Sequence, residues 1–365
     1  MKRLKILISL ALMMLMCGCE ITMEKVTSEI SETEPEFNGY LDEETIYDIL
    51  VTELAQGKSV IEFDKVIDVD VLNAIITRIE HEYPEYYWLS KTRTITTSSR
   101  YTTVDFNTVE ILNEEQTKAE FQVLEAAADE IISAMPAGLD DYGKILFIHD
   151  YLAENVVYAT DKVGIETEGL WDTAYGSLVQ GYAVCGGYAE GFTYLMKRLG
   201  IESGVVYGEV SDENGNQTGH AWNYVYLNNM YYWLDLTWDD TDDESNPVTH
   251  FYFLIDDRHM NKNRVLRKNQ YFVPACYSMD ENFYVRNDSY ITYYTAEAVG
   301  LAVLSSPYDD KIELMFADKL SYDTAVKDLL ENGKLWELPE CDGISDSVSY
   351  SLNDDMYAIC INTGA

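Results

Sequence analysis

The sequence predicts an α+β protein with a packed core and more than one structural unit. The chain has 365 residues and 47% of them are hydrophobic, which is enough for a buried core and for two or three modules. Segments with apolar residues at helical spacing are interspersed with short β-prone runs along most of the chain. A helix pattern that begins at Cys185 is followed by two alternating runs joined at Asn228-Asn229, which is typical of a helix packed on an antiparallel sheet.

The charge of the chain is strongly negative. It contains 25 Lys and Arg against 64 Asp and Glu, for a formal net charge of −39. Such a field repels phosphate backbones, so the sequence excludes a nucleic-acid partner. It also disfavours direct contact of the folded body with an anionic membrane surface.

The first residues have the pattern of an export signal. Lys2, Arg3 and Lys5 precede an apolar run from Ile6 to Met16, which has the length of a signal-peptide core and is too short to span a bilayer. The run ends in Met16-Cys17-Gly18-Cys19, which resembles the cleavage box of bacterial lipoproteins. The resemblance implies a signal peptide over residues 1–18, lipidation of Cys19 and attachment to the outer face of the cell membrane through that lipid alone. An ordinary secretory signal is the alternative.

Residues 19–40 are acidic and poor in large apolar side chains, so we expect a solvated tether. Residues 41–112 are predicted to form a small α/β module, with helices over 45–54 and 71–79 and strands over 60–63, 86–89 and 100–106. Residues 113–270 are predicted to form the central domain, which begins with helices over 113–135 and 141–156. Residues 271–365 are predicted to form a β-rich C-terminal module, with strands over 290–294 and 312–316, a helix over 321–330 and a final strand pair near Val348 and Tyr357.

The segment after Val184 combines a cysteine with a helix start. Tyr188, Phe192 and Leu195 keep helical spacing, and Gly200 ends the pattern. Cys185 therefore lies on the first turn, where free N–H groups and the helix dipole favour thiolate over thiol. Gly186 and Gly187 weaken a helix, so we interpret them as places where a substrate approaches the backbone closely.

The two runs around Asn228-Asn229 place a histidine beside a carboxylate. If Leu227 faces Met230 across a two-residue turn, Trp222 faces Asp235, and Asp235 is a diagonal neighbour of His220 on the same face. A carboxylate beside an imidazole fixes its tautomer and supports its charged form. The sequence thus predicts a Cys185, His220 and Asp235 triad, with Trp222 in the substrate cleft.

Three segments together resemble the transglutaminase-like superfamily. They are Val184-Cys185-Gly-Gly-Tyr188-Ala-Glu190, Gly219-His220-Ala-Trp222-Asn223 and Trp233-Leu-Asp235-Leu-Thr-Trp238-Asp-Asp240. The resemblance implies a papain-like core, in which a helix bearing the cysteine packs on a sheet bearing His and Asp. It also implies Cys185 as nucleophile, His220 as base and Asp235 as the residue that orients the base. The backbone N–H of Cys185 is an expected oxyanion donor, and Gln180 or Tyr175 is a candidate for a second one.

The remaining features indicate neither a metal nor a cofactor. The acidic run at residues 239–244 lacks the glycine and spacing of a helix–loop–helix calcium site, so we interpret it as a solvated loop, with calcium binding left open. His149 is interpreted as structural, and His250 has no metal-ligand spacing. No CxxC pair suggests zinc. A disulfide between Cys341 and Cys360 is left open.

These patterns predict an exported, lipid-anchored thiol enzyme that acts on amide bonds of a peptide or protein. Hydrolysis is favoured over cross-linking because water is abundant outside the cell and no amine-binding feature is visible. The alternative is a non-catalytic cell-surface binding or scaffold module that retains the fold.

Overall fold

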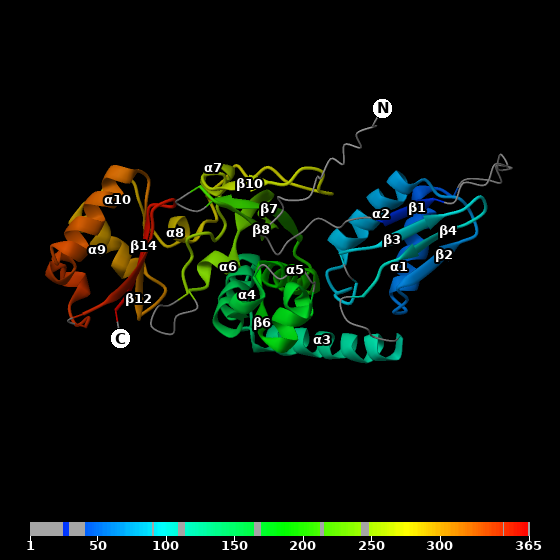
Figure 1. The fold of residues 1–365 in the computed structure, drawn as a ribbon. Helices are drawn as coiled ribbons and strands as arrows, with labels where there is room; N and C mark the ends of the chain where they lie inside the picture. Colours follow the sequence, from blue (N-terminus) through cyan, green and yellow to red (C-terminus); the bar gives the residue numbers. More distant parts are fainter. Residues whose placement is uncertain are drawn as a thin grey trace, which may run out of the picture.

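The computed structural model describes residues 25–28, 41–89, 91–108, 114–163, 169–211, 215–241, 248–345 and 347–363. Three units lie in a row in Figure 1, with the N-terminal unit in blue, the central unit in green and yellow and the C-terminal unit in orange and red. The expected signal peptide and Cys19 lie outside the described residues. Among the described helices, none combines the length and the apolarity needed to cross a bilayer.

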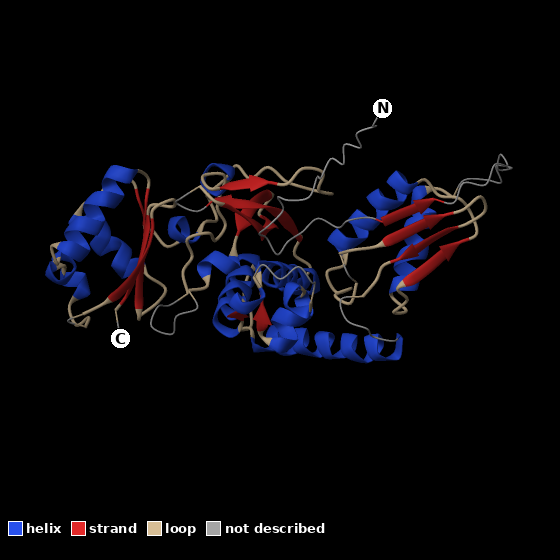
Figure 2. Cartoon of the chain, in the orientation of Figure 1, coloured by secondary structure: helices blue, strands red, loops and turns tan. Residues whose placement is uncertain are grey.

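The N-terminal unit is a four-stranded sheet with two helices on one face (Figure 2). Its sheet order is β1-β3-β4-β2. Its elements are β1 (Lys25–Ser28), α1 (Glu43–Leu54), β2 (Val60–Phe63), α2 (Val69–Glu82), β3 (Thr94–Thr97) and β4 (Thr102–Asp105). Asp42 and Asp68 accept hydrogen bonds from first-turn N–H groups and so fix the starts of the two helices. The helices and β2 agree with the sequence prediction.

The sequence analysis does not predict β3, and two further details of this unit differ from the prediction. Residues 25–28, which lie inside the expected tether, form β1 and pair with the edge of β3. An edge strand presents unpaired N–H and C=O groups, which explains why a polar segment can join it. Residues 86–89 form no strand; Tyr87 and Trp88 are instead buried in the core of the central unit. These two aromatic side chains join the N-terminal and central units.

The central unit is a second four-stranded sheet, of order β10-β7-β8-β9, covered by helices. Its helices are α3 (Glu114–Ala134), α4 (Asp141–Asn155), α5 (Cys185–Leu199), α6 (Leu236–Asp239), α7 (Asp257–Met260) and α8 (Phe283–Arg286). Its strands are β5 (Val157–Tyr158), β6 (Tyr182–Ala183), β7 (Ser203–Ser211), β8 (Gln217–Leu227), β9 (Met230–Leu234) and β10 (Arg264–Leu266). Short helical turns at Leu170–Asp172 and Gly176–Gln180 lead into β6.

The β8–β9 hairpin has the predicted register. Leu227 pairs with Met230, and Asn223 pairs with Leu234. Asn228 and Asn229 both have positive φ, 50° and 67°, as a two-residue turn that follows the twist of the strands requires. The ladder ends at Leu234, and Asp235 then caps α6. The confirmed register brings Asp235 next to the end of β8 that carries His220.

The C-terminal unit is a third sheet, of order β11-β12-β14-β13, with its own buried core. Its elements are β11 (Tyr290–Ile291), α9 (Ala296–Ser305), β12 (Lys311–Phe316), α10 (Lys319–Ala325), β13 (Ser349–Asn353) and β14 (Ala358–Asn362). The sequence reasoning missed α9. Cys276, Phe283 and Tyr284, from the first part of the predicted unit, lie in a buried cluster that also contains Met315, Ala358 and Cys360.

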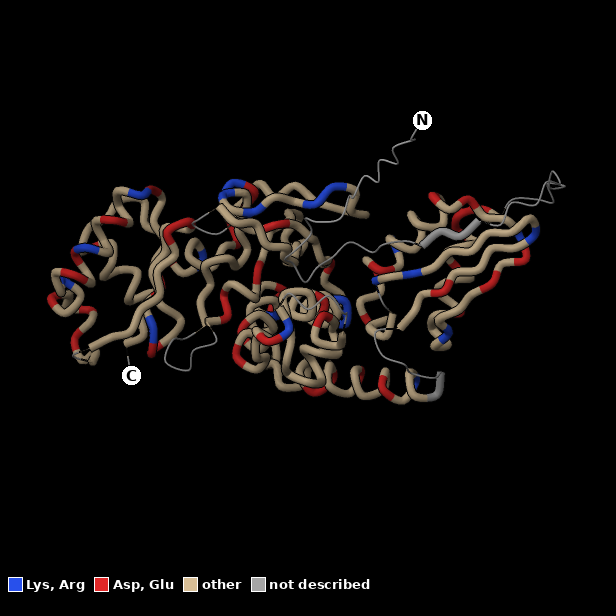
Figure 3. Tube along the Cα trace, viewed as in Figure 1, with Lys and Arg blue, Asp and Glu red and all other residues tan. Residues whose placement is uncertain are grey.

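The described cysteines are buried free thiols at positions 185, 276, 341 and 360. Cys341 and Cys360 therefore do not form a disulfide in the structure. Acidic side chains are spread over all three units in Figure 3, as the composition indicates.

We predict that the Asn228-Asn229 turn contributes measurably to stability. Asn229→Ala places a Cβ-bearing residue without a compensating polar side chain in the left-handed region, so the free energy of unfolding should fall by about 1 kcal/mol. Asn229→Gly should match the wild type within a few tenths of a kcal/mol. Urea denaturation of both variants measures the difference, and equal stability of the Ala and Gly variants would contradict it.

Candidate active site

Cys185 is the first residue of α5. Val184 precedes it in extended conformation, and Gly200 closes the helix with φ 73°. Asn223 of β8 fixes the helix on the sheet, because its Nδ2 donates to the Ala189 carbonyl and to Thr193 Oγ1, both at 2.9 Å. A cysteine on the first helical turn packed on an antiparallel sheet is the arrangement that the sequence predicts.

Gly186 and Gly187 have a different role from the one expected. Both are buried, and a Cβ on Gly186 would lie 1.9 Å from Asp172 Oδ1. A Cβ on Gly187 would lie 2.6 Å from the Trp171 carbonyl oxygen. The glycines therefore let the 171–173 segment pack against the start of α5, and a role of their backbone in a substrate cleft stays a prediction.

His220 and Asp235 form a buried hydrogen-bonded pair. His220 Nε2 lies 2.8 Å from Asp235 Oδ2, and the Asp235 side chain has no exposed surface. Asp235 Oδ1 also accepts a hydrogen bond from the Trp238 N–H at the start of α6. Burial works against ionisation of Asp235, but the positive charges and hydrogen bonds of His220 and Arg264 outweigh it and lower the pKa of the carboxyl.

Arg264 is the residue of this site that the sequence reasoning missed. Its Nη2 and Nε donate to Asp235 Oδ2 at 2.6 and 3.2 Å, and its side chain is fully buried. The guanidinium packs on the rings of both Trp238 and Tyr252, at 4.5 and 4.2 Å from their centroids. Arg264 comes from β10, a strand of three residues that pairs with β7, and so short a strand leaves no periodic signal in the sequence.

The thiol and the imidazole are not joined by a hydrogen bond in the structure. Cys185, Ala189 and Ala221 form a small buried cluster, and Ala221 is the neighbour of His220 in β8. His220 Nδ1 has no hydrogen-bond partner among the described residues, while Nε2 is held by Asp235. Nδ1 is thus the nitrogen available to the thiol.

The other predicted residues are a tryptophan that packs on His220 and two residues upstream of Cys185. Trp222 stacks on His220 with ring centroids 5.9 Å apart, but it is 1% exposed and so is a core residue. Tyr175 stacks on Tyr87 at 4.6 Å and packs against the central core. Gln180 is exposed at the end of the 176–180 turn. The roles of Tyr175 and Gln180 as oxyanion donors stay predictions.

A second charged group lies at the start of α5. Lys91 Nζ, from the N-terminal unit, is 2.6 Å from Asp172 Oδ2 and 3.9 Å from Glu190 Oε1. Burial raises the pKa of Glu190 to about 8, in spite of the nearby lysine. Asp172 is the residue that fills the space beside Gly186, so Lys91 connects the N-terminal unit to the helix that carries the thiol.

The first residue of the acidic run after Trp238 is buried, whereas the sequence predicts a solvated loop there. Asp239 is fully buried and accepts hydrogen bonds from the Tyr252 N–H, at 3.1 Å, and from Thr249 Oγ1. Asp240 accepts a hydrogen bond from the Tyr188 hydroxyl. Residues 242–247 lie outside the described residues.

A cavity of about 590 Å³ lies at the other end of α5, and it is separate from the thiol. Its lining includes Lys197 and Gly200 of that end together with Tyr224, Tyr231 and Phe272. Lys197 is twelve residues from Cys185, which corresponds to about 18 Å along a helix.

The family model of the transglutaminase-like superfamily matches residues 128–237. This range holds α4, α5, the β7–β8–β9 sheet and all three predicted triad residues. The central unit is therefore a transglutaminase-like domain, and the papain-like core expected from the sequence motifs is confirmed.

No curated protein matches the chain. Among solved structures, the chain is similar to a crystal structure of a TGase, at 13% identity and a TM-score of 0.30, over 51% of this chain and 52% of that chain. It is also similar to a putative cysteine protease from Cytophaga hutchinsonii, at 15% identity and a TM-score of 0.27, over 50% of this chain and 71% of that chain. The chain thus spans about half the length of the TGase.

We predict that Arg264 is essential to the stability of the buried pair. Arg264→Met removes two hydrogen bonds from a carboxylate that has no access to water, so the free energy of unfolding should fall by about 3–5 kcal/mol. Arg258→Met, at an exposed position of α7, is the matched control and should change it by no more than about 0.5 kcal/mol. Chemical denaturation of the two variants measures both changes in the free energy of unfolding. A loss at Arg264 no larger than that at Arg258 would show that the ion pair is dispensable.

Proposed function

We propose that the protein is a transglutaminase-like thiol enzyme that cleaves peptide or protein amides, with Cys185 as nucleophile, His220 as base and Asp235 as the orienting carboxylate. The observation that carries the proposal is the buried 2.8 Å contact between His220 and Asp235 within the matched domain. The position of Cys185 at the start of the helix packed on the same sheet supports it.

The proposed mechanism is acyl transfer in two steps. His220 Nδ1 takes the thiol proton of Cys185, and the thiolate attacks the amide carbonyl. The free N–H groups of the first turn of α5 are the donors closest in the chain to the oxyanion that forms. His220 then gives the proton to the leaving amine. The resulting thioester is released by water, which yields an acid, or by a second amine, which yields a new amide.

The buried partners of His220 account for its tautomer. Asp235 accepts the proton on Nε2, which leaves the Nδ1 lone pair for the thiol. Arg264 balances part of the Asp235 charge, so the carboxylate stays ionised while it orients the ring. We favour water as the acceptor because none of the described features around Cys185 is arranged to bind an amine.

The proposed location is the outer face of the cell membrane, with Cys19 carrying the lipid. The basic residues before the apolar run 6–16 and the Gly18-Cys19 junction support this proposal. The strongly acidic composition would keep the folded body away from anionic lipid, so the anchor would be the only attachment.

The state of the thiol provides a direct prediction. Burial raises the pKa of Cys341 to about 11 and also raises the pKa values of Cys276 and Cys360, so these thiols should be unreactive at mildly acidic pH. Iodoacetamide should label Cys185 first. His220→Ala should slow the labelling at least about tenfold, and Asp235→Asn should slow it less, because the ring remains.

Peptide mapping by mass spectrometry measures these rates, with His259→Ala as a control at a histidine outside the pair. Labelling of Cys185 no faster than that of the other thiols, or unaffected by His220→Ala, would favour the non-catalytic scaffold.

The anchor provides a separate prediction. Mature protein should begin at Cys19 and sediment with membranes, because two or more acyl chains hold a protein stably at a bilayer. Cys19→Ala should release it. Recovery of the wild-type protein in the soluble fraction with its Met1 start would contradict the proposed anchor.

A further inference from the structure

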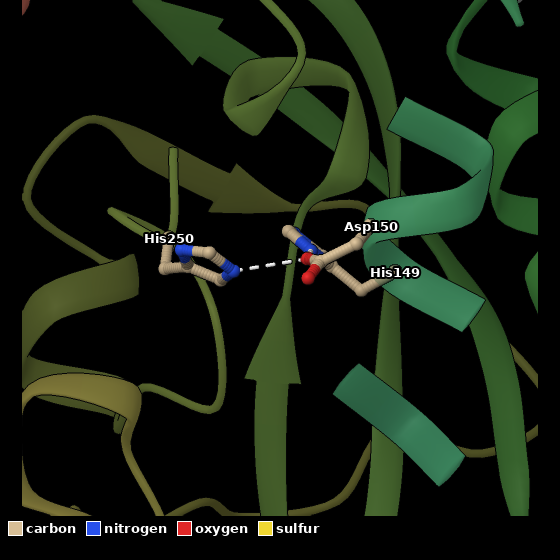
Figure 4. Close-up of side chains that lie close together, drawn as sticks. All are labelled: His149, Asp150 and His250. Atoms are coloured by element: carbon tan, nitrogen blue, oxygen red, sulfur yellow. Dashed lines mark hydrogen bonds and ion pairs between the residues drawn. The ribbon is translucent and has the colours of Figure 1, made fainter. Parts of the chain in front are cut away.

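A second buried group of ionisable side chains lies between the central and C-terminal units. His149 and Asp150 are consecutive residues of α4, and His250 follows Thr249 in the segment after the acidic loop. One nitrogen of each ring and one oxygen of Asp150 lie within 4.8 Å of one another. Figure 4 shows the His250 ring pointing toward the Asp150 carboxylate.

The three donor atoms converge. His149 Nδ1 and His250 Nε2 are each 2.9 Å from the same oxygen, Asp150 Oδ1. The two rings are stacked with centroids 5.2 Å apart, and both are completely buried. Two imidazole nitrogens and one carboxylate oxygen gathered this closely are donors that a divalent cation can bind together.

The other nitrogen of each ring also contacts a carboxylate. His149 Nε2 lies 3.2 Å from Asp239 Oδ2, and His250 Nδ1 lies 2.8 Å from Glu313 Oε1. A histidine that binds a metal ordinarily donates its other ring N–H to a carboxylate or a carbonyl, which fixes the ring and its tautomer. Both His149 and His250 have this support.

The supporting carboxylates are themselves fixed. Asp239 accepts N–H donation from Tyr252, and Glu313 accepts a hydrogen bond from the Tyr284 hydroxyl at 3.1 Å. Lys311 Nζ lies 2.9 Å from Glu313. The Tyr308 hydroxyl donates to Asp150 Oδ2 at 2.9 Å, on the oxygen that does not face the rings. Each of the three side chains is thus held by a partner of its own: His149 by Asp239, His250 by Glu313 and Asp150 by Tyr308.

We propose that His149, Asp150 and His250 form a binding site for a first-row divalent cation, with Zn²⁺ as the ion that the donors suit best. Two imidazole nitrogens and one carboxylate oxygen are ligands that Zn²⁺ uses in proteins, whereas Ca²⁺ takes six to eight oxygens. Asp150 is the ligand with exposed surface, 24% of its side chain, so a fourth ligand from solvent would enter at its side.

Metal binding requires each imidazole to be unprotonated at the nitrogen that binds, so the ion competes with protons for this group. The group could not be predicted from the sequence, because Asp150 and His250 are 100 residues apart along the chain.

The bound ion would connect three parts of the molecule. It would join α4 to the 248–254 segment directly and would reach β12 of the C-terminal unit through Glu313. Through His149 it would also hold Asp239, the last residue of α6, whose first turn is capped by Asp235. The site is therefore a candidate structural metal centre, linked through α6 to the residue that holds His220.

The test uses the full-length protein, stripped with chelator and titrated with Zn²⁺ against a chromophoric chelator. We expect one equivalent to bind, with release of protons in weakly buffered solution. Asp150→Asn keeps the shape of the side chain but lowers its donor strength and should weaken binding at least about tenfold. Asp141→Asn, at an exposed position of the same helix, should leave the affinity unchanged.

Co²⁺ bound to the wild-type protein provides a readout that needs no variant. Imidazole ligation in a four- or five-coordinate site should produce visible absorption bands that Zn²⁺ abolishes stoichiometrically. Substoichiometric binding, or equal affinity in the Asp150→Asn and Asp141→Asn variants, would overturn the proposal and leave a network held by protons alone. Labelling of Cys185 is measured separately, so failure of this site is distinguishable from failure of the proposed enzyme.

Discussion

The central domain depends on one buried hydrogen-bonded network, in which Asp235 contacts both Arg264 and His220. A fully buried carboxylate is costly unless positive charge and hydrogen bonds surround it, and here a guanidinium and an imidazole share one of its oxygens. The other oxygen caps α6. The β8–β9 register, the position of β10 and the aromatic side chains around Arg264 therefore have to be formed together. The imidazole is thus held by a buried hydrogen-bonded network on the sheet, whereas the thiol lies on a separate element, α5.

The start of α5 is constrained in a different manner. Gly186 and Gly187 allow the 171–173 segment to lie directly against the first turn, and Asp172 then receives Lys91 from the N-terminal unit. The thiol is thus positioned by close backbone packing, whereas the imidazole is positioned by charge. The small α6 helix lies between the two buried ionic groups, with Asp235 at its start and Asp239 at its end.

The features that could be predicted from the sequence are those set by local spacing. The Asn228-Asn229 turn fixes the pairing of β8 with β9. The proximity of His220 and Asp235 then follows from the number of residues between each of them and the turn. The helix after Val184 and the motif order identify the domain family. Arg264 could not be predicted because β10 is three residues long and its partner strand lies more than fifty residues earlier. The buried role of Asp239 and the His149–Asp150–His250 group depend on contacts across the fold, which no local pattern encodes. The glycines after Cys185 could be recognised as sites of close approach, but only the structure identifies what approaches them.

The most direct test of the central claim is detection of an acyl-enzyme on Cys185. The protein is mixed with p-nitrophenyl acetate, quenched in acid and mapped by mass spectrometry. A thiol nucleophile served by His220 predicts a stoichiometric acetyl group on Cys185 that hydroxylamine removes as a thioester and that forms much more slowly in His220→Ala. Absence of acetyl on Cys185 in a folded protein, or an equal rate of its formation in His220→Ala, would contradict the account.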